Sequence, residues 1–342
     1  MIDSEPILTQ WIEITGRVPT PIPEDHLGRI SLDFLRKGTA ALTAWQSDSL
    51  IAMGGFLCTD SKLSVSIPDN SLDRQPASTR IADDPWRLIV RHARDCAARL
   101  HVNQLEILIP DEDYPGIPHL CRSLTRSGFT RQARISHWKR LPTRPSSLTV
   151  PAPQIHSLTA EILQHQTGYR EELASLLQQV LQNSSDLTNI DSPNPTDLIA
   201  EWIEDQATLL VDYNTHGTPL GLCCCISRQA NKRYGIPNSV EIRYLGVHPE
   251  HRRRGIGHRL VNAAVHFAFT GKITQPPPNI SLNNRNPRQP HKATEINICV
   301  DEDNLPAISL YQKNGFVRDR KLQLWNDTKT ESDSGRRLAN QL

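Results

Sequence analysis

The stretch from Val240 to Gly257 constrains the fold of this chain more than any other. It opens with the β-branched and aromatic run VEIRYLGV, which is typical of a buried strand. Pro249 ends that strand, because proline cannot donate to a ladder. A basic turn with Gly255 follows and leads into a helical pattern with one apolar face (Leu260, Ala264 and Phe267). This arrangement predicts an anion site, since glycines let N–H groups approach a phosphate and the helix dipole favours negative charge.

The turn is neither a Walker loop nor a dinucleotide fingerprint. No Gly-Lys-Ser/Thr follows it, and it lacks the third glycine and the acidic residue about 20 positions on. It does match Arg/Gln-x-x-Gly-x-Gly/Ala, with Arg252 first and Gly257 last. A second block, NLPAISLYQKNGF at 304–316, matches Asn-x-x-Ala-x-x-Leu-Tyr-x-x-x-Gly-Phe. Both patterns are signatures of the GNAT superfamily of acetyl-CoA-dependent N-acetyltransferases, which the chain therefore resembles.

The two halves of the chain repeat one pattern. The segment EILIPDED at 106–113 is similar to EINICVDED at 295–303, and a Gly-Phe pair follows each, at 128–129 and 315–316. Each half reads as three strands followed by helix, strand, helix and a final strand. The resemblance then implies an α/β (α+β) fold of two tandem GNAT-type domains. Each is expected to hold a mixed, mostly antiparallel central sheet flanked by helices.

Composition shifts along the chain predict where these domains begin and end. We expect a GNAT-like domain over 1–140, a Pro- and Ser-rich linker over 141–153, a catalytic domain over 154–326 and a disordered tail over 327–342. The first domain is interpreted as a degenerate copy, because IADDPW at 81–86 stands where the glycine turn belongs. Its two aspartates would repel a pyrophosphate and its proline removes a donor. That half is then structural or substrate-shaping.

The composition argues against several classes of protein. A formal net charge of +1 does not suit a nucleic-acid or membrane-surface binder. No apolar stretch approaches the roughly 18 residues that span a bilayer, and the N-terminal MIDSEP lacks the basic and apolar regions of a signal peptide. We therefore expect a cytoplasmic protein, as a monomer or homodimer. The seven cysteines form no Cys-x-x-Cys pair, which favours small buried side chains over a metal site.

The resemblance implies which residues hold acetyl-CoA. The strand backbone at Leu245, Gly246 and Val247, where the family's strand splays from its neighbour, would bind the pantetheine arm. The turn and helix start would bind the phosphates (Arg252, Arg253, Arg254, Gly255, Ile256, Gly257 and His258). A triple arginine is a solvated charge run in most proteins, but beside this turn a phosphate role is favoured. Asn304 binds the cofactor, caps its helix, or does both.

Two residues are candidates for the chemistry. Acetyl transfer to an amine needs a group that takes the amine proton, and the departing thiolate benefits from a proton. By resemblance Glu241 is the base and Tyr311 the general acid. The alternatives are a strand carboxylate paired with Arg243, which would weaken Glu241 as a base, and a core aromatic for Tyr311. His248 and His251 have no partner at metal or nucleophile spacing and are expected at the surface.

The sequence thus predicts an enzyme that moves an acetyl group from acetyl-CoA to a primary amine, of a small molecule or of a peptide N-terminus. The second block resembles the ribosomal-protein N-terminal acetyltransferases, whereas a tandem chain with an inactive first half resembles the mycothiol synthase group. Acidic side chains near the acceptor site would attract a cationic amine, although a solvated acidic helix face looks the same (Glu201, Glu204 and Asp205). The alternative class is an acyl-CoA sensor or scaffold without turnover.

Overall fold

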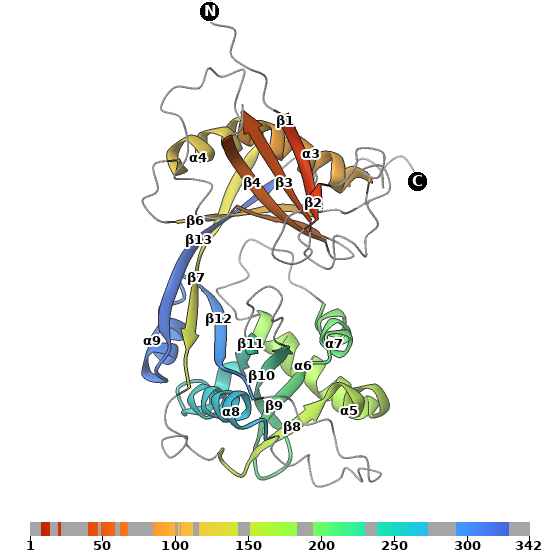
Figure 1. Cartoon of the computed structure of the whole chain (residues 1–342). Helices are drawn as coiled ribbons and strands as arrows, with labels where there is room; N and C mark the ends of the chain where they lie inside the picture. The colour runs from red at the N-terminus through yellow and green to blue at the C-terminus, as the bar shows by residue number, and fades with distance from the viewer. Residues whose placement is uncertain are drawn as a thin grey trace, which may run out of the picture. The chain divides into compact units, whose positions relative to one another are not determined.

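A computed structural model of the chain describes residues 8–13, 20–21, 40–46, 49–58, 62–67, 85–99, 102, 104–111, 116–142, 151–182, 194–229, 238–272 and 292–327. The chain divides into two compact units, unit 1 (residues 1–135 and 320–342) and unit 2 (residues 136–319). Each unit holds a mixed, mostly antiparallel open sheet flanked by helices (Figure 1). The predicted fold class is confirmed.

The described residues of the first half of the chain include these strands of unit 1: β1 (Leu8–Glu13), β2 (Thr20–Pro21), β3 (Ala40–Gln46), β4 (Ser49–Cys58), β5 (Lys62–Ser66) and β6 (Gln104–Pro110). Their order is β2-β1-β3-β4-β5-β6, and all neighbours are antiparallel except β5 and β6, which are parallel. The helices are α3 (Pro85–Arg99) and α4 (Ile117–Arg126). Helical spacing of the apolar positions in α3 buries one face in the core (Trp86, Ile89, Val90, Ala93 and Ala97).

Unit 2 repeats this plan with the strands β8 (Ile155–Thr159), β9 (Thr208–Tyr213), β10 (Pro219–Arg228), β11 (Ser239–Val247) and β12 (Glu295–Asp301). Their order is β12-β11-β10-β9-β8, and only β11 and β12 are parallel. The helices are α5 (Ala160–His165), α6 (Thr167–Gln182), α7 (Pro195–Glu204), α8 (Ile256–Thr270) and α9 (Leu305–Lys313).

The sheet of unit 2 has a helical layer on each face, as alternation along its strands requires. In β10, Cys223 and Cys225 point to a core shared with α8, whereas Leu222, Cys224 and Ile226 point to a core shared with α6 and α7. Side chains of a strand alternate between faces, so every residue of β10 between 222 and 226 is buried. This explains why the run LCCCI reads as continuously apolar.

The two units exchange the ends of their last strands. The strand β7 (Phe129–Arg140) begins in unit 1 and ends in unit 2, and β13 (Val317–Asp327) runs from unit 2 back into unit 1 (Figure 1). Within unit 1, Leu322–Asn326 of β13 pairs antiparallel with residues 106–110 of β6. Within unit 2, Trp138 of β7 is 3% exposed and belongs to the α8 core, while Ser136 Oγ donates to the carbonyl of Val300 at 3.4 Å.

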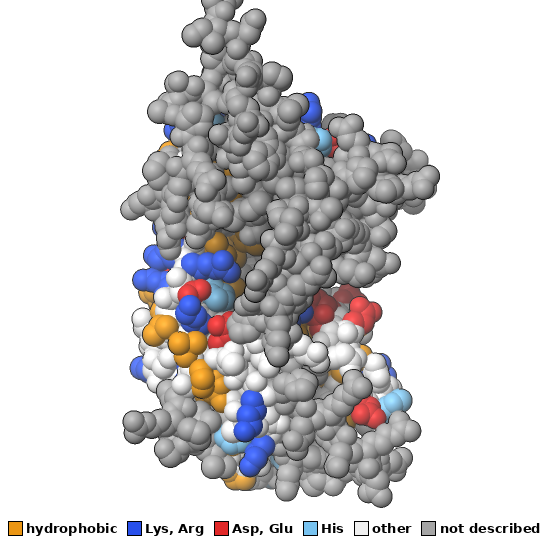
Figure 2. All heavy atoms as spheres, viewed as in Figure 1, with side chains coloured by type: hydrophobic (Ala, Val, Ile, Leu, Met, Phe, Trp, Pro, Cys, Tyr) orange, Lys and Arg blue, Asp and Glu red, His pale blue; other side chains and the backbone are white. Residues whose placement is uncertain are grey.

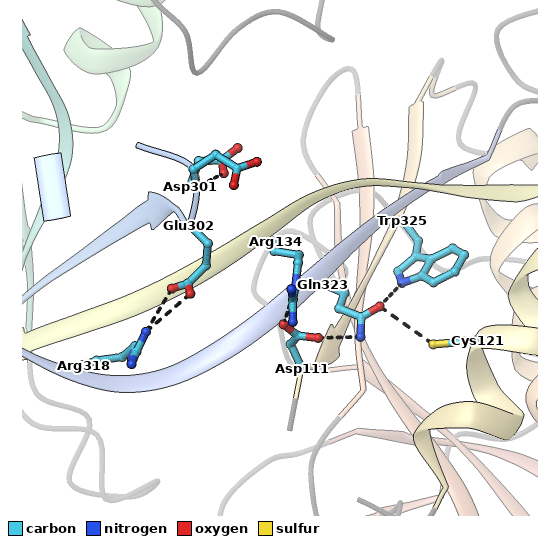
Figure 3. Close-up of polar contacts among 9 residues, drawn as sticks. Asp111, Cys121, Arg134, Asp301, Glu302, Arg318, Gln323 and Trp325 are labelled. Atoms are coloured by element: carbon cyan, nitrogen blue, oxygen red, sulfur yellow. Dashed lines mark hydrogen bonds and ion pairs between the residues drawn. The ribbon is translucent and has the colours of Figure 1, made fainter. Parts of the chain in front are cut away.

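Polar contacts hold the end of β13 inside unit 1. Figure 3 shows Gln323, whose Nε2 donates to Asp111 Oδ1 at 2.7 Å and whose Oε1 accepts from Trp325 Nε1 at 3.2 Å. Arg134 Nε donates to the other oxygen of Asp111 at 2.6 Å. Gln323 and the carboxylate of Asp111 are nearly inaccessible, so their hydrogen bonds replace those lost to water. The end of β13 is therefore an integral part of unit 1.

This division differs from the expected one. The predicted boundaries assigned 129–140 wholly to the first domain and 317–326 wholly to the second, whereas the compact units divide at 135/136 and 319/320. Asp327, which was expected to begin the tail, ends β13 and is 2% exposed. Most of the predicted linker (143–150) and the rest of the tail (328–342) lie outside the described residues.

We predict that a fragment of residues 136–319 folds as an independent unit and that a fragment of residues 154–326 does not. The second fragment lacks Trp138, and removing a large buried aromatic side chain costs about 3–5 kcal/mol. It also carries the end of β13 without β6, its partner strand. Thermal unfolding followed by circular dichroism checks this, and cooperative transitions with equal midpoints in both fragments would contradict it.

Candidate functional site

A one-residue bulge interrupts β11 between Glu241 and the stretch Leu245–Val247. Cys225 of β10 pairs with Ile242 and Cys224 pairs with Tyr244, so Arg243 is the extra residue on β11. Before the bulge, Val240 and Ile242 face the α8 core; after it, Leu245 and Val247 do. Tyr244 instead belongs to the α6–α7 core. Glu241 and Arg243 alternate with Val240 and Ile242 and therefore face the α6–α7 side. The bulge shifts the alternation, so Tyr244 also faces that side.

The parallel pairing of β11 with β12 stops at the bulge. Ser239–Ile242 pairs with Glu295–Ile298, and the described register goes no further, although β11 continues to Val247 and β12 to Asp301. The backbone of Leu245, Gly246 and Val247 therefore borders an opening between two parallel strands. On its other edge the same stretch stays paired with β10, which leaves main-chain groups on the β12 side for a ligand.

The corresponding strands of unit 1 do not open. All five residues of β5 pair with β6, from Lys62 opposite Gln104 to Ser66 opposite Leu108, and the N–H of Ile67 then donates to the Leu108 carbonyl. The described pairing of β4 with β5 contains no register shift. The first unit therefore lacks both the bulge and the strand opening among its described residues. Of the predicted substitute for the glycine turn, residues 81–84 lie outside the described residues, and Pro85 begins α3.

The predicted anion site of unit 2 forms a turn beside this opening. Gly255 caps the N-terminus of α8 with φ of 78°, a left-handed conformation that glycine adopts without strain, and Arg253 has φ of 64°. Gly255 has no side chain to accept from the first N–H groups of α8, which have no partner within a helix. The three side chains Arg252–Arg254 are exposed. Positive charge and outward N–H groups therefore occupy the same turn.

Close packing surrounds the two ends of this turn. A Cβ at Gly257 would lie 3.2 Å from Leu310 Cδ2 of α9 and 3.9 Å from Val247 Cγ2, so glycine brings α8, α9 and β11 together here. The side chain of Ile256 is 2% exposed and lies in the core, so only its backbone faces a ligand. His258 is exposed, and its Nε2 lies 3.0 Å from Asn262 Nδ2.

The second predicted motif forms the start and one face of α9. Asn304 is the N-cap of α9, and its Oδ1 accepts from the N–H of Ala307 at 3.1 Å, which is the capping role considered for it. Tyr311 is 4% exposed, belongs to the α8 core and packs against Phe316 at 5.9 Å between ring centroids. The ring of Tyr311 therefore lies in the core.

Glu241 lies in a chain of ion pairs on the α6–α7 side of the opening. Its carboxylate accepts from Arg243 Nη1 at 3.1 Å and from Arg228 Nη2 at 3.2 Å, and Arg243 Nη2 reaches Glu201 Oε1 of α7 at 3.4 Å. Burial alone would lower the pKa of Arg243, but the carboxylates of Glu241 and Glu201 outweigh burial and raise it. The predicted pairing of Glu241 with Arg243 is present, and a second arginine joins it.

The other titratable residues named from the sequence do not form a reactive cluster. His248 and His251 lie with their rings 5.1 Å apart, and the side chain of His248 accepts from the N–H of Glu250. Cys223 and Cys225 are free, and their Sγ atoms lie 3.8 Å apart in the buried sheet. Their mutual contact and burial raise the pKa of the Cys223 thiol. Among the described residues no group of three or more His, Cys, Asp and Glu side chains could hold a metal ion.

Sequence reasoning missed one pair beside the turn. Asp212 of β9 is buried, and its Oδ2 accepts from Arg259 Nε of α8 at 2.8 Å. The available signal was an aspartate inside the apolar strand TLLVDY, together with an arginine in the first turn of the helix after the glycines. Neither residue is part of the motif patterns, so they drew no attention.

The comparison with protein families agrees with this geometry. Residues 204–318 match the model described as Acetyltransferase (GNAT) domain. This part of the chain is a GNAT domain. The match spans α8, the bulged strand β11 and α9, so it contains both predicted motifs. No curated protein matches the sequence.

Solved structures extend the fold comparison to both units. The chain is similar to a tandem GNAT protein from the clavulanic acid biosynthesis pathway, with 12% identity, 94% of this chain and 98% of that chain covered, and a TM-score of 0.50. It is also similar to a functionally unknown conserved protein from Staphylococcus epidermidis. The identity is 10%, the comparison covers 80% of this chain and 90% of that chain, and the TM-score is 0.52. A GCN5-related N-acetyltransferase from Sphaerobacter thermophilus is 14% identical. That comparison covers 84% of this chain and 79% of that chain, with a TM-score of 0.48. Because the identities are this low, the likeness to the first two of these structures concerns the fold alone.

The apolarity of the helices and the distribution of surface charge bear on membrane and nucleic-acid binding. None of the described helices is long and apolar enough to cross a membrane. On the face shown in Figure 2, described side chains of both charges lie near one another, as a formal net charge of +1 leads one to expect.

Proposed function

We propose that the protein is an acetyl-CoA-dependent N-acetyltransferase whose active site lies in unit 2. The observation that carries this proposal is the opening between β11 and β12 directly beside the Gly255 turn. A ligand that carries both an extended arm and a pyrophosphate fits this pair of features, the open strand edge and the glycine turn. The arm would lie along the open strand edge at Leu245, Gly246 and Val247, and the phosphates at the turn 252–258.

The described residues fit such a ligand in charge and in space. Three exposed arginines oppose the phosphate charge, and the glycines keep side chains out of the turn. When bound, acetyl-CoA supplies the acetyl group as a thioester. Transfer forms a bond from the acceptor nitrogen to the acetyl carbon and breaks the carbon–sulfur bond, so the nitrogen loses a proton and the sulfur gains one.

The two candidate residues divide these proton transfers. In the proposal Glu241 takes the proton of the acceptor amine, on the α6–α7 side of the opening, and the hydroxyl of Tyr311 gives a proton to the thiolate. Unit 1 is proposed to be structural or substrate-shaping, a role supported by its closed β5–β6 pair. A primary amine of a small molecule or of a peptide N-terminus is the proposed acceptor.

A second candidate function is an acyl-CoA-binding protein without turnover. Two observations favour it: Glu241 is held between Arg228 and Arg243, and Tyr311 is 4% exposed. Both functions require CoA binding. Only the enzyme releases free thiol from acetyl-CoA when the right acceptor is present, so a panel of amines, polyamines and peptides with thiol detection separates the two.

The first prediction here is that CoA binds the native protein and that Gly257→Glu abolishes binding. A carboxylate at this position repels the phosphates and crowds Leu310. Isothermal titration with CoA measures the affinity. Gly257→Ala adds a methyl group without charge, to which Leu310 must yield slightly, so it should weaken binding far less than Gly257→Glu. Gly168→Glu should retain binding, because a Cβ at Gly168 meets no atom within 4 Å. A native protein that ignores CoA would refute the proposed function.

The second prediction concerns the base. Once an acceptor is found, Glu241→Gln should lower kcat by about 10²–10⁴-fold, the usual contribution of a positioned base. The loss should shrink as pH rises, because the free amine becomes abundant without help. Steady-state kinetics across pH measure it, and Glu302→Gln, which also removes a carboxylate that pairs with an arginine (Arg318), is the control. Normal turnover by Glu241→Gln at neutral pH would make Glu241 a structural partner of the two arginines.

The third prediction concerns the acid. Tyr311→Phe removes one hydroxyl and keeps the ring that packs on Phe316, so CoA affinity should stay the same while kcat falls by about tenfold or more. Tyr213→Phe is the matched control, because Tyr213 is another buried tyrosine of unit 2 and lies in the α6–α7 core. Equal kcat in the two variants would show that Tyr311 serves the core alone.

A further inference from the structure

Asp212 is a buried carboxylate in a strand that is otherwise apolar. Its side chain is 1% exposed, and in the neighbouring strands it lies opposite Ile155 and Gly221. Burial raises the pKa of Asp212, although Arg259 pulls it in the opposite direction. Its Oδ1 has no hydrogen-bond partner among the described residues. Burying a carboxylate with one unsatisfied oxygen destabilises the folded state, so stability alone does not explain why an aspartate occupies this position.

The partner of Asp212 connects it to the glycine turn. Arg259 Nε donates to Asp212 Oδ2 at 2.8 Å, and Nη1 of the same guanidinium donates to the carbonyl of Arg254 at 3.3 Å. Arg259 is 29% exposed, so its head lies between the buried carboxylate and the turn. Because the guanidinium is planar and rigid, fixing Nε fixes the direction in which Nη1 donates.

Anchoring the Arg254 carbonyl orients the next N–H group. The C=O of Arg254 and the N–H of Gly255 belong to one planar trans peptide, in which they point in opposite directions. A carbonyl held toward Arg259 therefore turns the Gly255 N–H away from Arg259. The left-handed φ of 78° at Gly255 then leads into the first N–H groups of α8. The contact thus presets a group of donors for an anion.

The packing beneath α8 makes this reach possible. A Cβ at Gly221, which is paired with Asp212, would lie 2.9 Å from the Gly246 carbonyl oxygen, 3.0 Å from Ile256 Cγ2 and 3.2 Å from Leu260 Cδ1. Glycine therefore lets the first turn of α8 sit directly on β10, at the level of Asp212. The carboxylate and the guanidinium meet because of this close approach.

We propose that Asp212 is a positioning residue for the phosphates of acyl-CoA, acting through Arg259 on the peptide between Arg254 and Gly255. This inference rests on the proposed function of unit 2. Asp212 touches no phosphate itself. It holds Arg259 as a fixed support for the turn, in place of a mobile cation at the surface.

The test compares Asp212→Asn with the native protein for two probes, CoA and pantetheine, which lacks phosphates. Asparagine keeps the size of the side chain and removes the charge that fixes Arg259. The affinity for CoA should fall about tenfold to a hundredfold, the range for one charged hydrogen bond. The affinity for pantetheine, measured by NMR titration at saturating concentration, should not change. A purely structural role would weaken binding of both probes alike.

Two further variants keep the proposal falsifiable if Asp212→Asn folds poorly. Arg259→Lys retains the positive charge but replaces two donors at fixed separate positions, Nε and Nη1, with a single nitrogen, so it should lose CoA affinity like Asp212→Asn. The double variant Asp212→Asn/Arg259→Lys should bind CoA no more weakly than Arg259→Lys alone. Both substitutions break the same connection from Asp212 through Arg259 to the Arg254 carbonyl, so their effects do not add. Asp319→Asn, which removes an ion pair with Lys139 elsewhere in unit 2, should bind CoA normally.

The outcomes separate the two levels of inference. Native CoA affinity in Asp212→Asn or in Arg259→Lys, or equal losses for CoA and pantetheine, would overturn the positioning role and leave the proposed function intact. A native protein that binds pantetheine and CoA equally well would show that the turn does not serve phosphates. A native protein that binds neither would overturn the proposed function itself.

Discussion

One extra residue in β11 determines how the site of unit 2 is built. Arg243 has no counterpart on β10, and three consequences follow from that single insertion. The alternation of side chains reverses, the parallel pairing with β12 ends at Ile242, and the strand edge up to Val247 becomes available. In unit 1 the corresponding strands β5 and β6 stay paired along the whole of β5, and the described pairing of β4 with β5 has no register shift. The difference between the two copies is therefore a local change in backbone register more than a loss of individual side chains.

The sequence was informative wherever function depends on local geometry. The proline after β11, the glycines at the start of α8 and the asparagine at the start of α9 each act on backbone within a few residues, so their pattern predicts their structure. Tyr311 and Glu241 were harder to interpret, because their surroundings come from distant segments. The contact of Glu241 with Arg228 and the packing of Tyr311 in the core decide how each can act, and neither follows from spacing.

Two pairings could not be predicted from the sequence, although Asp212 is a charged residue in an apolar strand. Asp212 and Arg259 are 47 positions apart, and only the tertiary approach of α8 to β9 makes them a pair. The exchange of strand ends was also hidden, because the apolar alternation of β7 and β13 specifies a strand and does not specify its neighbour. A repeat in sequence favoured two self-contained halves, whereas each sheet is completed with residues from the other half.

That exchange has a consequence for the order in which the molecule is made. A chain leaves the ribosome from its N-terminus, and domains usually fold in that order as they emerge. Here β6 must wait for Leu322–Asn326, and the hydrogen bond between Asp111 and Gln323 joins residues 212 positions apart. Unit 1 cannot complete this pairing until residue 326 has been synthesised. Contacts of such long range slow folding, so the first half to be translated is the last to close.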